Sequence, residues 1–198
     1  MRVRSLIEIE KKYRLTKKQR DSVLRRLCEI NAKPRGEEFE ENTLYRGGVL
    51  DSGFQVLRLR RVDGHATLTF KERIPGTSSI KHQREEESSV GDPDVLNEIL
   101  GALGFQAAMV YEKRRQCWQI GEAEVVIDEL PFGLFMEIEA SEEEIARVEE
   151  LLGATRLQAE MESYPRLTAK LGQRCGGLIE ARFNSRRKRS LRSFDPAR

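Results

Sequence analysis

The fold is decided by the stretch LIEIEKKYRL, which runs from Leu6 to Leu15. Its apolar and charged residues alternate with the period of two that is typical of a β-strand. Glu8, Glu10 and Lys12 therefore project in a row from one face, with neighbours roughly 6.6 Å apart at about 3.3 Å per residue. Two carboxylates at that spacing repel each other, and a divalent cation bound by their oxygens would relieve the repulsion. Taken alone, the stretch is equally compatible with a strand whose charged face points to solvent.

Size and composition indicate one folded domain followed by a basic tail. The 198 residues are 34% charged and 38% hydrophobic, which leaves enough apolar residues for a core. The net charge of +2 hides an asymmetry, because residues 173–198 carry eight basic and two acidic residues, whereas residues 1–172 carry 27 and 31. We expect a domain over residues 1–172 and disorder over residues 173–198, where apolar residues are few. A solvated tail explains the cluster Arg186–Arg189 more simply than nucleic-acid binding does.

The cysteines and the apolar segments exclude several classes of protein. Cys28, Cys117 and Cys175 are odd in number and widely separated, so neither a disulfide framework nor a zinc motif is indicated. Such cysteine usage is typical of a reducing cytoplasm. The N-terminal residues contain no apolar core of a secretory signal, and no run of about 18 apolar residues predicts a membrane span. We therefore expect a cytoplasmic protein without a membrane partner.

The remaining pattern predicts an α+β fold. Helices are expected after the capping box of Thr16 and Gln19, after Asp92, and after Ser141, with a short helix following Pro165. Besides the first strand, the alternation predicts strands at residues 42–49, 55–62, 66–72, 82–90, 107–120, 124–130 and 134–140. About eight strands, mostly antiparallel and flanked by helices, are therefore expected.

Charges of one sign recur at alternate positions on nearly every predicted strand. The acidic ones are Glu8, Glu10, Glu85, Glu87, Glu137 and Glu139, and the basic ones are Lys12, Arg58, Arg60, Lys71, Lys113 and Arg115. Solvated faces explain any single strand, but like charges along one face gain nothing in water. If the strands close into a barrel, the two signs meet in one interior and neutralise each other. Arg and Lys would then bind phosphate oxygens while glutamates bind Mg²⁺ or Mn²⁺, a combination that suits a triphosphate.

With these motifs the chain resembles a known family, the CYTH superfamily of triphosphate tunnel metalloenzymes. Its hallmark E-x-E-x-K stands at Glu8, Glu10 and Lys12. The later matches follow in family order, namely R-x-R at Arg58 and Arg60, T-x-K at Thr69 and Lys71, the acidic pair Glu85 and Glu87, K-x-R at Lys113 and Arg115, Asp128, and E-x-E at Glu137 and Glu139. The resemblance covers roughly residues 4–170.

The resemblance implies an eight-stranded antiparallel barrel, or tunnel, with helices outside it. It implies that Mg²⁺ or Mn²⁺ is bound by Glu8, Glu10, Glu85, Glu87, Asp128, Glu137 and Glu139. It implies that phosphate is bound by Lys12, Arg58, Arg60, Lys71, Lys113 and Arg115. Lys12 would be the catalytic residue, which touches phosphate or helps to orient the nucleophile. The sequence leaves one register open, because Arg84 and Glu86 have the opposite parity to Glu85 and Glu87.

The sequence therefore predicts a metal-dependent enzyme that acts on a small-molecule triphosphate. Hydrolysis of inorganic or small organic triphosphate, as in thiamine triphosphatases, is favoured because no motif that reads a nucleobase stands out. A class IV adenylate cyclase, which converts ATP to cyclic AMP and pyrophosphate, is the alternative within the family. A non-catalytic module that binds polyphosphate or nucleotide is the alternative of another class. Nucleic acid is not favoured as a partner, and a homodimer stays open.

Overall fold

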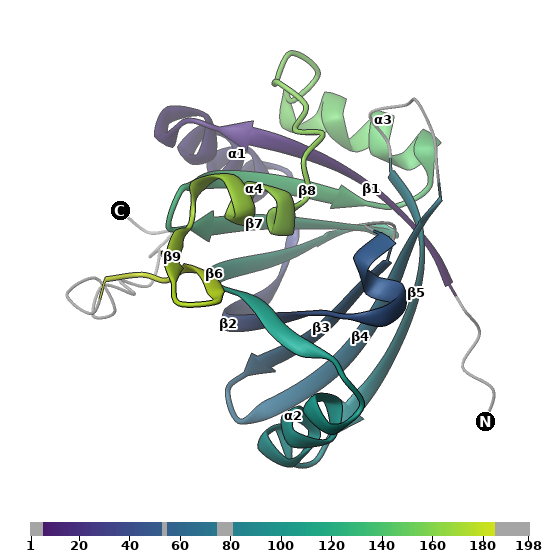
Figure 1. The fold of residues 1–198 in the computed structure, drawn as a ribbon. Coiled ribbons are helices and arrows are strands. Elements are labelled where there is room, and N and C mark those ends of the chain that lie inside the picture. The colour runs from purple at the N-terminus through teal and green to yellow at the C-terminus, as the bar shows by residue number, and fades with distance from the viewer. Residues whose placement is uncertain (1–5, 53–54, 75–80, 185–198) are drawn as a thin grey trace.

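Eight antiparallel strands surround a common interior in the computed structural model, which describes residues 6–52, 55–74 and 81–184 (Figure 1). For residues 6–8, 73–74 and 81–83 only the backbone is described. The strands are β1 (Leu6–Leu15), β2 (Lys33–Arg46), β3 (Gln55–Val62), β4 (His65–Ile74), β5 (Lys81–Val90), β6 (Gln106–Ile120), β7 (Ala123–Leu130) and β8 (Gly133–Glu139). They pair in the order β2-β3-β4-β5-β1-β8-β7-β6, and β2 also pairs with β6, which joins the two ends of the row. The predicted antiparallel, tunnel-like barrel in an α+β fold is confirmed.

The closure is loose at β1, because this strand divides its pairing between two neighbours. Its first half pairs with β5 and its second half with β8, and Glu10 is the residue that pairs with both. Along the second half of β1, residues 158–160 are hydrogen-bonded to the strand edge that β5 does not cover. The Arg14 N–H donates to a carbonyl of this segment at 3.2 Å, and the Lys12 carbonyl accepts an N–H from it at 2.8 Å. The segment that leads to the last helix is thereby hydrogen-bonded to the first strand.

Helices form where their caps are predicted. The Thr16, Asp92 and Ser141 side chains each accept a backbone N–H in the first turn of the helix that follows. The helices are α1 (Lys17–Glu29), α2 (Pro93–Ala102), α3 (Glu142–Leu152) and α4 (Tyr164–Leu171), with a 3₁₀ turn η1 (Gly48–Ser52). Within the described ranges, no helix is both long enough and apolar enough to cross a membrane.

Two of the three hydrophobic clusters lie outside the barrel, beneath its helices. Tyr13 of β1 and Ile138 of β8 pack against α1 and α3, whose Leu27 and Val148 are fully buried there. A second cluster lies beneath α2, around Leu59 of β3. The third contains Leu44, Tyr111 and Tyr164, which line the cavity inside the barrel. Each such aliphatic side chain contributes about 1.5–3 kcal/mol on burial. Because strand residues alternate, covering the apolar parity with helices leaves the charged parity to face the interior.

The expected disorder after residue 172 is wrong for the first part of the predicted tail. Residues Gln173–Cys175 and Leu178–Ala181 form strands β9 and β10, and β10 pairs in parallel with β6. Phe183 is buried, and its backbone N–H donates to the carboxylate of Glu112 at 2.7 Å. The basic residues of the cluster Arg186–Arg189 dominated the composition of residues 173–198. They concealed the apolar residues of the short stretch that forms β10 and contains Phe183. Residues 185–198, which contain the basic cluster, lie outside the described residues.

Truncation after Gly172 should destabilise the protein, because it removes the strand β10, which pairs with β6, and the buried Phe183. Loss of a buried aromatic side chain costs roughly 3 kcal/mol or more. In a chain of this size such a loss lowers the melting temperature by about 6–12 °C. Thermal unfolding followed by circular dichroism measures the shift. A variant that ends at Asn184 is the control and should melt like the full chain, and equal melting of the two truncations would contradict the packing of this segment.

Candidate functional site

The interior of the barrel contains a cavity of about 340 Å³ with a wall of mixed charge. Its basic side chains are Lys12, Arg58, Arg60, Lys71, Lys113, Arg115 and Arg166, and its acidic ones are Glu10, Glu85, Glu87, Glu124, Glu137 and Glu139. All six side chains predicted to bind phosphate lie on this wall, with five of the seven predicted metal ligands. Seven of the eight barrel strands contribute to these charges. The charged faces of the strands therefore meet in one place.

The structure answers the register question that the sequence left open on β5. Glu85 and Glu87 line the cavity, whereas Arg84 and Glu86 are exposed outside it and pair with each other. Lys71 of the neighbouring strand β4 forms an ion pair with Glu85. The acidic residues of β5 thus face the same interior as the basic residues of β3 and β4.

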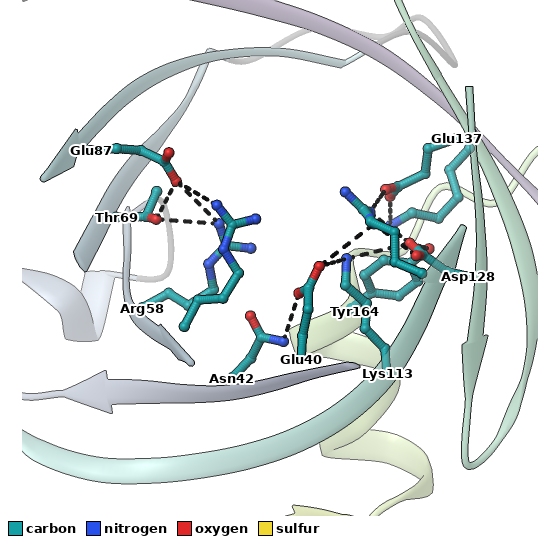
Figure 2. Close-up of polar contacts among 12 residues, drawn as sticks. Glu40, Asn42, Arg58, Thr69, Glu87, Lys113, Asp128, Glu137 and Tyr164 are labelled. Atoms are coloured by element: carbon teal, nitrogen blue, oxygen red, sulfur yellow. Dashed lines mark hydrogen bonds and ion pairs between the residues drawn. The ribbon is translucent and has the colours of Figure 1, made fainter. Parts of the chain in front are cut away.

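One part of the wall is a linked set of side chains from β3, β4 and β5, on the left of Figure 2. Arg58 donates to the hydroxyl of Thr69 at 3.3 Å, and that hydroxyl donates to Glu87 at 2.6 Å. Arg60 donates to the same carboxylate at 3.3 Å. Burial opposes ionisation of Glu87, but the Thr69 hydroxyl and the Arg60 guanidinium outweigh it and hold the pKa of this carboxyl below its ordinary value. One ionised carboxylate therefore orients two arginines.

The facing part of the wall comes from β1, β6, β7 and β8. Arg115 donates to Asp128 at 2.6 Å and to Glu137 at 2.7 Å. The Lys12 ammonium lies 3.1 Å from Glu137, and the Lys113 ammonium lies 3.5 Å from Asp128 (Figure 2). Three cations are thus packed together by two carboxylates, on the side of the cavity opposite the two arginines of β3.

Glu40 and Asn42 of β2 are fully buried residues that sequence analysis missed. The Glu40 carboxylate lies 3.2 Å from Lys113 and 3.7 Å from Arg115, and it accepts a hydrogen bond from Asn42 at 3.1 Å. Burial alone would raise the pKa of Glu40, but the two cations outweigh it and lower the pKa to about 2. The glutamates that surround this position, within residues 37–41, hid the alternation that would have revealed it.

Tyr164, in the first turn of α4, contacts several of these charged side chains. Its hydroxyl donates to Asp128 at 2.8 Å, and the Lys12 ammonium lies 3.7 Å from the centre of its ring. The Lys113 ammonium lies 5.5 Å from the same ring. Burial and the neighbouring Asp128 carboxylate raise the pKa of this phenol well above its ordinary value, so it remains a hydrogen-bond donor. The sequence predicted a short helix here, but nothing in the helix pattern indicated which of its residues faces the barrel.

Lys12 and Lys113 are both buried, yet their pKa values are shifted in opposite directions. Burial disfavours the charged form of Lys12, but Glu137 and Glu10 outweigh it and raise its pKa above the ordinary value. For Lys113, burial and the adjacent Arg115 lower the pKa despite the carboxylates nearby. Lys12 is therefore a fixed cation, whereas Lys113 gives up its proton more easily.

The carboxylates that best fit a metal ion come from β1, β7 and β8. Glu139 of β8 pairs directly with Glu10 of β1 and with Glu124 of β7, and Glu137 lines the cavity two residues earlier on β8. Such hard oxygen donors suit Mg²⁺ or Mn²⁺. As the described side chains stand, no three acidic, histidine or cysteine groups converge on one point, so binding would require rotation of these glutamates. The donor chemistry of this part of the wall fits the predicted divalent cation.

Four predicted metal ligands stand apart from this group. Glu85 and Glu87 line the cavity from β5, where they form ion pairs with basic residues of β3 and β4. Asp128 is fully buried behind the wall, and its oxygens accept hydrogen bonds from Arg115 and Tyr164. This geometry favours a role in positioning those side chains over the predicted role as a metal ligand. The side chain of Glu8 lies outside the described residues.

Comparison with known proteins places the chain in one family. The model of the CYTH domain matches residues 6–168. The chain belongs to the CYTH domain family. A Methanocaldococcus jannaschii protein named "Putative adenylate cyclase MJ0240" is 29% identical over 153 residues, which cover 74% of this chain and 84% of that protein.

Solved structures share the fold. The protein PH1012 from Pyrococcus horikoshii is 25% identical, with a TM-score of 0.67 over 79% of this chain and 96% of its own. A protein from Hippeastrum, "Putative adenylyl cyclase HpAC1", is described as having a dominant triphosphatase activity. It is 19% identical, with a TM-score of 0.60 over 79% of this chain and 91% of its own. At that identity the likeness is one of fold.

Glu40→Gln should destabilise this CYTH protein at neutral pH and change its response to acid. The variant removes one counter-charge from the buried Lys113 and the partly buried Arg115, which costs roughly 3 kcal/mol. Because the pKa of Glu40 is lower in the folded protein than in the unfolded chain, its charge contributes stability above about pH 4.5, and the contribution is lost as the pH falls toward 2. The difference between wild type and variant should therefore narrow in acid.

Urea unfolding at pH 7 and pH 3.5 measures both free energies. Glu38→Gln is the matched control, since Glu38 is exposed on the same strand, and it should change stability by less than about 0.5 kcal/mol. A gap of the same size at both pH values would contradict the coupling of Glu40 to the two cations.

Proposed function

We propose that this protein is a metal-dependent triphosphatase, which hydrolyses inorganic or small organic triphosphate and releases orthophosphate. The observation that carries the proposal is the cavity wall, on which seven basic side chains converge from the barrel and α4. A triphosphate concentrates several negative charges in a small volume, and cations held in a preformed cavity stabilise such charge without reorganisation. Membership of the CYTH family supports a triphosphate as the ligand.

The contacts suggest how the wall would divide its work. Arg58, Arg60 and Lys71 would bind phosphate oxygens from the side of β3 and β4, and Arg115 would bind them from the facing side. Each of these four side chains forms an ion pair with a carboxylate in the structure. The ligand phosphates would therefore replace carboxylates as partners, and the cations are already desolvated and oriented when the ligand arrives.

A divalent cation would be held by the glutamates that face the cavity on β1, β7 and β8, namely Glu10, Glu124, Glu137 and Glu139. Mg²⁺ or Mn²⁺ bound there would neutralise charge on the phosphate oxygens. The bound cation would relieve the repulsion between the glutamates and would also neutralise part of the negative charge of the ligand. The acidic side chains of the wall would thus bind the metal of a metal–triphosphate complex, and the basic side chains would bind its phosphates.

The two buried lysines would both bind phosphate oxygens. Lys12, whose pKa is raised, would stay charged, so its predicted catalytic role would be electrostatic. The Lys113 ammonium lies within 3.5 Å of both Glu40 and Asp128, which balance its charge. Because burial and Arg115 lower its pKa, Lys113 would hold its proton less firmly than Lys12.

The cyclase alternative rests on a specific observation, the name of the Methanocaldococcus jannaschii relative. In a cyclase the ribose 3′-hydroxyl of ATP would attack the α-phosphorus and release pyrophosphate. The same phosphate-binding wall would serve either reaction. The description of the Hippeastrum protein indicates that a CYTH-type fold can carry triphosphatase activity, which agrees with the reaction proposed here.

Purified protein with Mg²⁺ or Mn²⁺ should release orthophosphate from inorganic triphosphate and from thiamine triphosphate faster than it makes cyclic AMP from ATP. Separation of the products by ion exchange measures all three reactions. Activity should disappear in EDTA and in Glu10→Gln, which keeps the size of the side chain but removes its charge. Glu86→Gln is the matched control, since Glu86 is exposed outside the cavity. Cyclic AMP and pyrophosphate with little orthophosphate would favour the cyclase, and binding without turnover would favour the non-catalytic module.

Arg58→Ala and Arg60→Ala should each weaken the binding of inorganic triphosphate by about 10- to 100-fold, because charge-assisted hydrogen bonds contribute roughly 1.5–3 kcal/mol each. Arg61→Ala should leave binding unchanged. Arg61 has the opposite parity and points away from the cavity, where it pairs with Asp94 of α2 at 2.7 Å. Isothermal titration calorimetry measures the three dissociation constants. Equal losses in all three variants would refute the assignment of the inward face of β3.

A further inference from the structure

The strands β2 and β6, whose pairing closes the barrel, carry two carboxylates directly opposite each other on their outer face. Glu41 of β2 pairs with Glu112 of β6, while the neighbouring pair of Glu40 and Lys113 faces the interior (Figure 2). Like charges directly opposite each other across an antiparallel pair are destabilising. The Glu112 side chain is only 3% exposed, so solvent screens little of this repulsion. The closure of the barrel therefore needs a cation on its outer face.

Arg182, which directly follows β10, supplies that cation. Its guanidinium forms ion pairs with the carboxylates of both Glu41 and Glu112, the second at 3.3 Å. Arg61 of β3 lies 3.6 Å from Glu41 and balances that carboxylate from another side. Arg182 thus contacts one carboxylate on each of the two strands at once.

Phe183 holds Arg182 in place over both strands. Its ring centre lies 6.3 Å from that of Phe39 on β2, and the Arg114 guanidinium of β6 lies 4.1 Å from the centre of the same ring. Its backbone N–H donates to Glu112, and β10 pairs with β6 just before it (Figure 1). Residues 182–183 are therefore a clamp that joins β2 to β6 through ionic and aromatic contacts.

The clamp lies directly behind the part of the wall that carries Lys113. Because successive strand residues point to opposite faces, Glu112 points outward between Tyr111 and Lys113, which both line the cavity. The Glu40 carboxylate lies 3.2 Å from the Lys113 ammonium and comes from the position next to Glu41. A separation of the two strands on the outer face would therefore lengthen an ion pair on the inner face.

We propose that Arg182 is a positioning residue of the cavity, which holds β2 against β6 and thereby fixes Lys113 and Arg115 for the binding of phosphate. The proposal rests on the proposed function. Arg182 is not among the residues that line the cavity, so it acts through Glu41 and Glu112. It also follows residues 6–168, which match the CYTH domain. The affinity of the cavity for triphosphate would therefore depend on a segment that lies beyond the matched domain.

Arg182→Met keeps the aliphatic stem, removes the charge and leaves Glu41 and Glu112 facing each other. The variant should raise the dissociation constant of inorganic triphosphate by about 5- to 10-fold, and it should raise KM more than it lowers kcat. Calorimetry and steady-state kinetics measure these quantities. A role in stability alone would lower the melting temperature but would leave the dissociation constant of the folded protein unchanged.

Removal of one of the two like charges should rescue this variant. In Arg182→Met/Glu112→Gln, the amide oxygen still accepts the N–H of Phe183, but the repulsion is gone. The dissociation constant should therefore return to within about 2-fold of the wild-type value. Glu180→Gln is the matched control, since it removes a partner that lies 3.2 Å from Arg182 but leaves the contacts with both strands. It should bind triphosphate like the wild type.

Hydrogen exchange of peptides that span residues 37–46 and 107–116 gives a reading that needs no ligand. Exchange should be faster in Arg182→Met and close to wild type in the double variant. An unchanged dissociation constant in Arg182→Met, or a double variant that binds no better than the single one, would overturn the positioning role. Failure of the proposed function would look different. In that case no variant would bind or hydrolyse triphosphate, while exchange would still decide whether Arg182 holds β2 against β6.

Discussion

The structure depends on the mutual neutralisation of charges inside the barrel. An isolated buried charge would be expelled or neutralised, because desolvation costs several kcal/mol per ion. Here Lys113 is buried and Arg115 is partly buried, with Glu40 and Asp128 as immediate counter-charges. The interior is thus stable only as a set, and removal of one member leaves its partners uncompensated. The same property allows the internal ion pairs to be replaced. A ligand that carries both signs of charge can take the place of the side chains that neutralise one another.

This constraint explains why the clusters beneath α1, α2 and α3 lie on the outside of the barrel. Each strand needs one apolar face that packs against the helices and one charged face that lines the barrel. Because successive residues of a strand point to opposite faces, one strand supplies both. Tyr13 and Lys12 are neighbours in sequence, yet one packs among the side chains beneath α1 and α3 and the other lies in the cavity. The helices α1 and α3 therefore stabilise the walls of the site without contributing side chains to it.

The sequence predicted the parts of the fold that follow from period alone. The strand of residues 6–15, the inward parity of Arg58 and Arg60, and the caps at Thr16 and Asp92 are visible in single stretches. Glu40 was not predictable in this way, because the acids beside it on β2 occupy both parities. Tyr164 was missed because its role depends on how α4 docks on the barrel, and docking is set by contacts between distant segments. The strand around Leu178–Ala181 was missed because composition was averaged over residues 173–198.

The pairing of β1 with residues 158–160 links two parts of the site that would otherwise be independent. The strand that carries Lys12 and the segment that leads to Met161 form one hydrogen-bonded unit. A displacement of the segment would therefore be transmitted to the Lys12 ammonium on the cavity wall. A ligand that fitted poorly against the segment would then be affected in its rate of reaction as well as in its affinity. Discrimination between substrates would be built into the backbone of the barrel rather than confined to the side chains that touch them.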